Sequence, residues 1–150
     1  MSAKAVKKTK KYDEYLELIQ SYLYTFYGIE VYFDRSYEDA YYHDGPEIHE
    51  DDYITINKRR PKEWQVHALL HEAGHIILRE ETEKYIARFP TLTIARRIDT
   101  LREEVLAWER GRMLADELQI EINAATFHRQ RTNALMKYSK WVVSPKDYKE

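Results

Sequence analysis

The 150-residue chain contains no cysteine. This absence excludes disulfide frameworks, thiolate zinc clusters and cysteine nucleophiles, so a bound metal ion must be held by histidine or carboxylate side chains. No long apolar run is present, which argues against a membrane-spanning helix and a secretory signal. Lysine and arginine number 24 against 26 for aspartate and glutamate, and this near-balance gives no reason to expect a highly charged partner. We therefore predict a cytoplasmic protein that does not bind membranes.

The length of the chain fits one domain. Residues 1–11 are rich in lysine and are predicted to form a basic flexible tail, which gives only weak support for nucleic-acid binding. Residues 12–143 are predicted to form the single domain, and residues 144–150 a C-terminal tail. The sequence does not indicate an oligomeric state.

Three runs of β-branched and aromatic residues, at positions 29–33, 40–43 and 53–57, are typical of strands. The turn signal Asp44-Gly45-Pro46 separates the second run from the third. We therefore predict a small, mostly antiparallel three-stranded sheet with residues 53–57 as an edge strand.

Helical periodicity predicts four helices, at residues 12–27, 62–79, 99–119 and 122–141. Gly28 is a stop signal for the first helix. Residues 80–98 combine charges with Pro90 and are predicted to form a partly helical connection that borders a cleft. The predicted fold class is α+β, with the sheet packed against the N-terminal helix and the helices that follow it.

The second predicted helix contains the sequence His71-Glu72-Ala73-Gly74-His75, which is an H-E-x-x-H motif. Residues four positions apart lie on the same side of a helix, so both imidazoles could bind one metal ion. Catalytic zinc has three protein ligands and an open position for water. Glu72 lies beside the histidine pair and is predicted to be the general base that acts on this water. The motif thus predicts Zn²⁺ as cofactor.

Two other residues of this helix need an interpretation. Gly74 lies within the motif although glycine weakens a helix by about 1 kcal/mol relative to alanine, so we expect another backbone or the substrate to approach there. His67 lies one turn before His71, and we interpret it as a satisfied or solvated histidine in preference to a residue that supports the metal site. Three histidines stay unassigned as candidates for the third ligand or for oxyanion stabilisation: His43, His49 and His128.

The third zinc ligand must come from another element, and the helix predicted at residues 99–119 offers Glu103 and Glu104. Glu104 shares its stripe with apolar and small residues, which let two helices approach closely. Glu103 shares its stripe with Arg110, as is typical of a solvated face. We therefore predict Glu104 as the third ligand, with Glu103 as the alternative.

With these motifs the chain resembles zincin-type, gluzincin-like metallopeptidases, and among them the compact ImmA/IrrE-like domain that also occurs in phage-encoded proteins. The resemblance rests on the strand at 53–57, similar to the family's edge strand, on the motif at 71–75, and on the E-x-x-A sequence that begins at Glu104. It implies a minimal zincin fold in which the two motif histidines and Glu104 hold zinc, Glu72 is the base, and an extended peptide adds to the edge strand.

The sequence therefore predicts a zinc-dependent peptidase that hydrolyses a protein or peptide substrate. Two alternatives stay open. One is a zinc-binding regulatory module without turnover, and the other is a SprT-like protease that acts on DNA-bound proteins, for which the basic N-terminus is the supporting feature.

Overall fold

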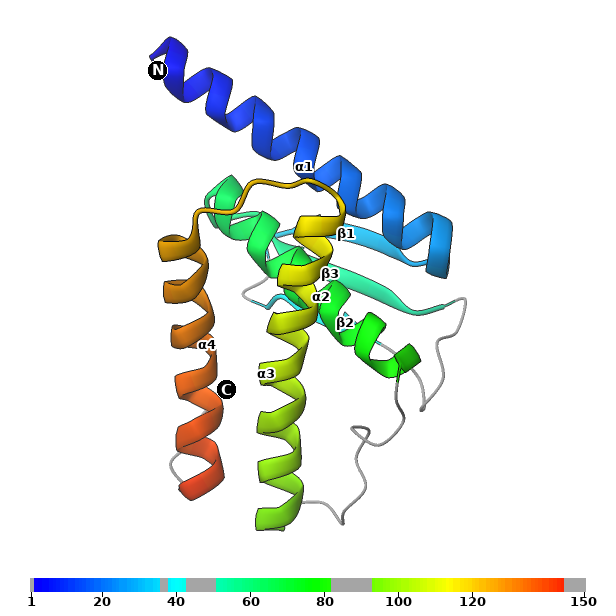
Figure 1. Cartoon of the computed structure of the whole chain (residues 1–150), viewed down its shortest axis with the longest axis vertical. Coiled ribbons are helices and arrows are strands. Elements are labelled where there is room, and N and C mark those ends of the chain that lie inside the picture. The colour runs from blue at the N-terminus through cyan, green and yellow to red at the C-terminus, as the bar shows by residue number, and fades with distance from the viewer. Residues whose placement is uncertain (1, 36–37, 43–50, 82–92, 145–150) are drawn as a thin grey trace.

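Four helices and three strands make up the described part of the chain, which covers residues 2–35, 38–42, 51–81 and 93–144 of a computed structural model (Figure 1). In chain order they are α1 (Ala3–Tyr27), β1 (Glu30–Asp34), β2 (Ala40–Tyr42), β3 (Tyr53–Asn57), α2 (Lys62–Glu81), α3 (Ile94–Glu117) and α4 (Ala124–Val143). The fold is α+β, as predicted.

The first helix, α1, begins at Ala3, well before the predicted start at Tyr12. Most of the segment that we expected to be a tail is thus helical, and Figure 1 shows its first turns extending beyond the rest of the molecule. The helix ends where predicted, because Gly28 adopts a left-handed φ of 66° and its N–H donates to the carbonyl of Tyr24 at 2.9 Å.

The sheet has the strand order β1-β3-β2. Strands β1 and β3 are parallel, whereas β2 and β3 are antiparallel. The predictions of a mostly antiparallel sheet and of an edge strand at residues 53–57 are therefore wrong, since the sheet is mixed and β3 is its central strand. Residue patterns identify strands but not their partners, and the chain between β1 and β3 is long enough to bring them together in parallel.

Helix α2 is the centre of the fold, because it contacts α1, α3, α4 and the sheet. Eleven of its residues are buried, including Leu69, Leu70 and Ile76. The core side of the sheet contributes Ile54 and Ile56 from β3, both fully buried. Packing on so many sides holds the backbone of α2 in place, as the scaffold of a precise site requires.

Helix α3 begins at Ile94, earlier than the predicted start at Asp99, because Thr93 caps it. The Oγ1 atom of Thr93 accepts a hydrogen bond from the N–H of Arg96 at 3.1 Å. Several predictions fall outside the described residues: most of the connection at 80–98, the C-terminal tail, and the candidates His43 and His49.

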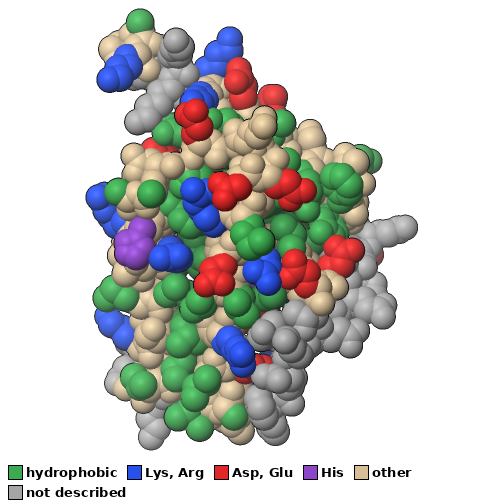
Figure 2. Space-filling view, viewed as in Figure 1, with side chains coloured by type: hydrophobic (Ala, Val, Ile, Leu, Met, Phe, Trp, Pro, Cys, Tyr) green, Lys and Arg blue, Asp and Glu red, His purple; other side chains and the backbone are tan. Residues whose placement is uncertain are grey.

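No helix within the described ranges has the length and apolar character needed to cross a membrane. Figure 2 shows acidic and basic side chains interspersed with hydrophobic ones on the face that it displays. This mixture agrees with the near-balance of charge in the sequence.

Candidate metal centre

Helices α2 and α3 cross with their backbones in contact at Gly74 and Gly111. A Cβ atom at Gly74 would lie 1.9 Å from the carbonyl oxygen of Ala107, and a Cβ atom at Gly111 would lie 2.4 Å from the carbonyl oxygen of Leu70. Ordinary van der Waals contact begins at 3.4 Å, so neither position has room for a side chain. The prediction that another backbone approaches Gly74 is confirmed, and this contact brings α3 beside the motif.

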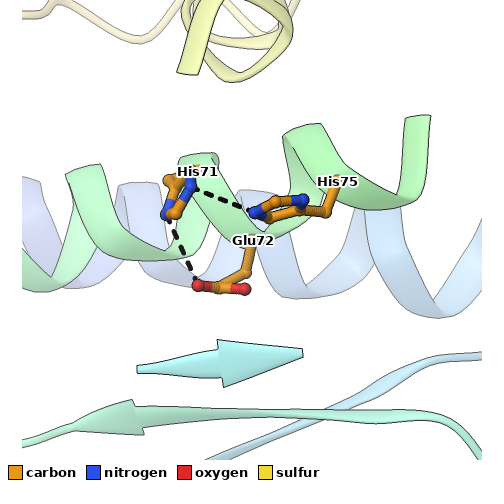
Figure 3. Close-up of side chains that lie close together, drawn as sticks. All are labelled: His71, Glu72 and His75. Atoms are coloured by element: carbon orange, nitrogen blue, oxygen red, sulfur yellow. Dashed lines mark hydrogen bonds and ion pairs between the residues drawn. The ribbon is translucent and has the colours of Figure 1, made fainter. Parts of the chain in front are cut away.

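The crossing places Glu104 of α3 opposite the two motif histidines of α2. Its Oε2 atom lies 2.7 Å from Nε2 of His75 and 3.2 Å from Nε2 of His71, and the two Nε2 atoms are 3.1 Å apart. Figure 3 shows both rings on the same side of α2 with these nitrogens facing each other. The side chains of His71 and His75 keep 12% and 13% of their exposure. Three candidate ligand atoms thus converge on a point that is partly open to solvent.

These three atoms fit a zinc ion. Two imidazole nitrogens and one carboxylate oxygen are a donor set typical of catalytic zinc. A tetrahedral ion about 2.0–2.2 Å from each ligand separates the ligand atoms by about 3.3–3.6 Å. The separations of 2.7 to 3.2 Å are somewhat shorter than this, a difference that small side-chain rotations can accommodate. Three protein ligands leave a fourth position for water or substrate.

Glu72 lies beside the histidines and not between them. It is only 5% exposed, and its Oε1 atom is 3.4 Å from Nδ1 of His71. Glu72, His71 and His75 form a group whose potential ligand atoms all lie within 4.8 Å of one another. In Figure 3 the carboxylate points from α2 toward the sheet, below the two rings. This position suits a carboxylate that contacts a water molecule at the centre.

Glu103 contacts the second histidine of the motif. Its Oε1 atom lies 3.4 Å from Nδ1 of His75, and its side chain is 19% exposed. Our interpretation of Glu103 as part of a solvated face is therefore wrong. Helix periodicity separates neighbouring residues by about 100°, but the ring of His75 lies between the Glu103 and Glu104 side chains and meets both.

Aromatic stacking on His71 is a feature that the sequence did not reveal. The ring of Trp108 stacks on the ring of His71, with centroids 4.3 Å apart and an angle of 9° between the planes. Phe127 of α4 packs edge-on against Trp108 at 5.4 Å. The only sequence feature that could have indicated this contact was the position of Trp108 four residues after Glu104, on the same stripe of the helix.

Carboxylates dominate the electrostatics of the centre. Burial by itself lowers the pKa of both motif histidines, but the carboxylates outweigh it: Glu72 and Glu104 raise the pKa of His71, and Glu104 and Glu103 raise that of His75 well above its ordinary value. Burial raises the pKa of Glu104, yet the two imidazoles hold it far below its usual range. A cluster with three carboxylates around two imidazoles favours a bound cation.

His67 is a core histidine, in agreement with the interpretation that we preferred. It is 2% exposed, and its Nδ1 atom lies 3.0 Å from Oε1 of Gln130. Because an amide oxygen only accepts hydrogen bonds, Nδ1 donates the proton. Among the unassigned histidines, His128 lies on the exposed side of α4 and accepts a hydrogen bond from Arg131 at 2.8 Å, so the structure does not bring it to the metal centre.

A cavity of about 370 Å³ lies elsewhere, between residues near the C-terminal ends of α1, α2 and α3. Its walls include the ion pair between Arg110 and Glu81, in which Nε and Oε2 are 2.7 Å apart. None of the candidate ligands lines this cavity, so it is separate from the metal centre.

Comparisons of the chain with protein-family models, with curated proteins and with solved structures found no match. The resemblance to zincins therefore rests on the H-E-x-x-H motif and on the E-x-x-A sequence that begins at Glu104, because the strand at 53–57 is central in the sheet and not at its edge.

Proposed function

We propose that the chain is a zinc-dependent peptidase of the zincin type with an ImmA/IrrE-like domain. The observation that supports this most is the convergence of His71, His75 and Glu104 from two helices, with mutual distances of 2.7 to 3.2 Å, beside the buried carboxylate of Glu72. Chance matches to the motif occur on ordinary helices, and a chance match gives no reason to expect a third ligand of suitable chemistry on a neighbouring helix.

The proposed roles follow from the chemistry of the side chains. A zinc ion held by the three ligands would polarise the substrate carbonyl and make water acidic enough to lose a proton near neutral pH. Glu72 accepts that proton and later delivers it to the leaving amine. Its burial keeps bulk water from its carboxylate, whose Oε1 atom lies 3.4 Å from Nδ1 of His71.

An extended substrate would pair with one of the outer strands of the described sheet, β1 or β2, because β3 is already paired on both sides. Strand β2 (Ala40–Tyr42) has β3 on one side and ends the described sheet on the other. Figure 3 shows the short strand β2 as the strand nearest to Glu72. A peptide added at this edge would form main-chain hydrogen bonds and lie close to the proposed base.

The decisive variant is Glu72→Gln, which removes the base but keeps the size of the side chain. We expect this variant to take up zinc like the unaltered chain and to lose peptide hydrolysis almost completely. Zinc content is measured on the purified protein, and hydrolysis is measured by digestion of a peptide library with and without a chelator.

Two results would argue against a peptidase. Hydrolysis that persists in the Glu72→Gln variant would exclude Glu72 as the base. Zinc uptake without any chelator-sensitive product in the unaltered chain would favour the alternative of a zinc-binding module without turnover.

A further inference from the structure

Consecutive residues of α3 contact His75 at the two nitrogens of its ring. Glu104 lies at Nε2 with a separation of 2.7 Å, and Glu103 lies at Nδ1 with a separation of 3.4 Å. Only Nε2 faces the point on which the three proposed ligands converge. Glu103 therefore contacts the nitrogen that remains free when Nε2 binds metal.

An anionic acceptor at Nδ1 controls which nitrogen of a neutral imidazole carries the proton. A carboxylate can only accept a hydrogen bond, so it favours the tautomer with the proton on Nδ1 and leaves the lone pair of Nε2 available as a ligand. The same hydrogen bond fixes the plane of the ring and makes the imidazole a stronger donor to metal.

The other motif histidine is held in a different way. Its Nδ1 atom lies 3.4 Å from Glu72, which the proposed mechanism uses as the base, and its ring stacks on Trp108. No aromatic ring is described as stacked on His75, and its described hydrogen-bond partners at Nε2 are His71 and Glu104. At Nδ1 the described partner is Glu103, which can give His75 the orientation that His71 obtains from an aromatic ring.

We infer that Glu103 is a positioning residue that orients His75 and strengthens it as a zinc ligand. This inference rests on the proposed zinc centre and adds to its three ligands and its base a fifth residue, which does not itself touch the ion. It also gives two successive residues of α3 separate tasks, since Glu104 would bind the ion and Glu103 would hold the histidine that binds it.

The test compares Glu103→Gln, Glu103→Ala and the control Glu109→Gln, which changes an exposed residue of the same helix. Zinc affinity is measured by competition with a chromophoric chelator. Melting temperature is measured with and without zinc, and the absorption spectrum of the Co²⁺ form reports on the ligand geometry. We expect both Glu103 variants to bind zinc about 10- to 100-fold more weakly, with an altered Co²⁺ spectrum and an unchanged melting temperature without metal. Glu109→Gln should match the unaltered chain in every measurement.

The outcomes separate this inference from the proposed function. If the unaltered chain binds zinc and both Glu103 variants bind it equally tightly, the positioning role is overturned while the zinc centre stands. A lower melting temperature without metal, combined with unchanged zinc affinity, would show a merely structural role and would also overturn it. An unaltered chain that takes up no zinc would overturn the zinc centre and the inference together.

Discussion

The contact between Gly74 and α3 leads to the sharpest prediction about this fold. Replacing Gly74 with alanine would place a Cβ atom 1.9 Å from the carbonyl oxygen of Ala107. Ordinary contact needs at least 3.4 Å, so the helices would have to separate by about 1.5 Å at this point. The obstructing atom belongs to a helical backbone, and it cannot turn away as a flexible side chain could.

The expected loss of stability is the difference between two effects. Overpacking a close contact costs about 1–3 kcal/mol, and a contact with backbone belongs at the upper end of that range. Alanine recovers about 1 kcal/mol of helix propensity. We therefore expect Gly74→Ala to lower the free energy of unfolding by about 2 kcal/mol, which corresponds to a fall of about 4–8 °C in melting temperature for a chain of this size.

We expect Gly74→Ala to lower zinc affinity more strongly than it lowers the free energy of unfolding. Glu104 lies one turn from Ala107 on α3, and metal–ligand bonds depart from their usual lengths by only about 0.2 Å. A separation of about 1.5 Å between the helices would draw Glu104 away from the two histidines and lower zinc affinity by at least tenfold. Gly111→Ala should act in the same way, because its Cβ atom would meet the carbonyl of Leu70 at 2.4 Å.

The assay is urea denaturation of the metal-free protein together with a zinc competition titration. A variant with both Gly74→Ala and Gly111→Ala should lose less free energy of unfolding than the two single variants lose together, because one substitution already separates the helices that the other would push apart. Glu109→Ala, at an exposed position of α3, is the control and should change stability by less than about 0.5 kcal/mol. If Gly74→Ala keeps full stability and full zinc affinity, the close crossing of α2 and α3 does not exist in solution.

Three further predictions concern metal and pH. Removing metal with a chelator should lower the melting temperature, because an ion that binds only the folded chain adds about 2.7 kcal/mol to the free energy of unfolding at a hundredfold excess over its Kd. An equal melting temperature with and without zinc would show that the folded chain has no zinc site. Zinc affinity should rise with pH through 6.5 and continue to rise above it, because the carboxylates raise the pKa of His71 and His75 and zinc must displace their protons. Chelator competition at several pH values measures the affinity, and an affinity that stops rising below pH 6.5 would contradict this prediction. Burial lowers the pKa of His67 below 6.5, so as the pH falls the unfolded chain binds a proton at His67 before the folded chain does. The free energy of unfolding of the unaltered protein should therefore fall more steeply between pH 7 and pH 5 than that of a His67→Gln variant. Urea denaturation at several pH values measures both slopes, and equal slopes would show that His67 is not buried as a neutral ring.

Local patterns predicted the helices and strands because their signals lie within each segment. The stop at Gly28 is confirmed by its left-handed backbone, and β3 spans Tyr53–Asn57 as predicted. Strand order was not predictable in this way, since alternation shows which face of a strand is buried but not which strand lies beside it. The start of α1 was missed because residues before Tyr12 carry charges instead of an apolar stripe, and a helix can continue beyond the part that packs.

In the candidate site, too, some features follow from local sequence patterns and others depend on how the helices pack. The sequence alone determined that His71 and His75 lie on one side of a helix with Glu72 beside them, because the spacing of side chains along a helix is a local geometric property. Only the tertiary structure decided that Glu104 faces both Nε2 atoms and that Glu103 meets the other nitrogen of His75. Those contacts depend on the angle and distance at which α3 crosses α2, and these are set where Gly74 and Gly111 allow the two backbones to touch.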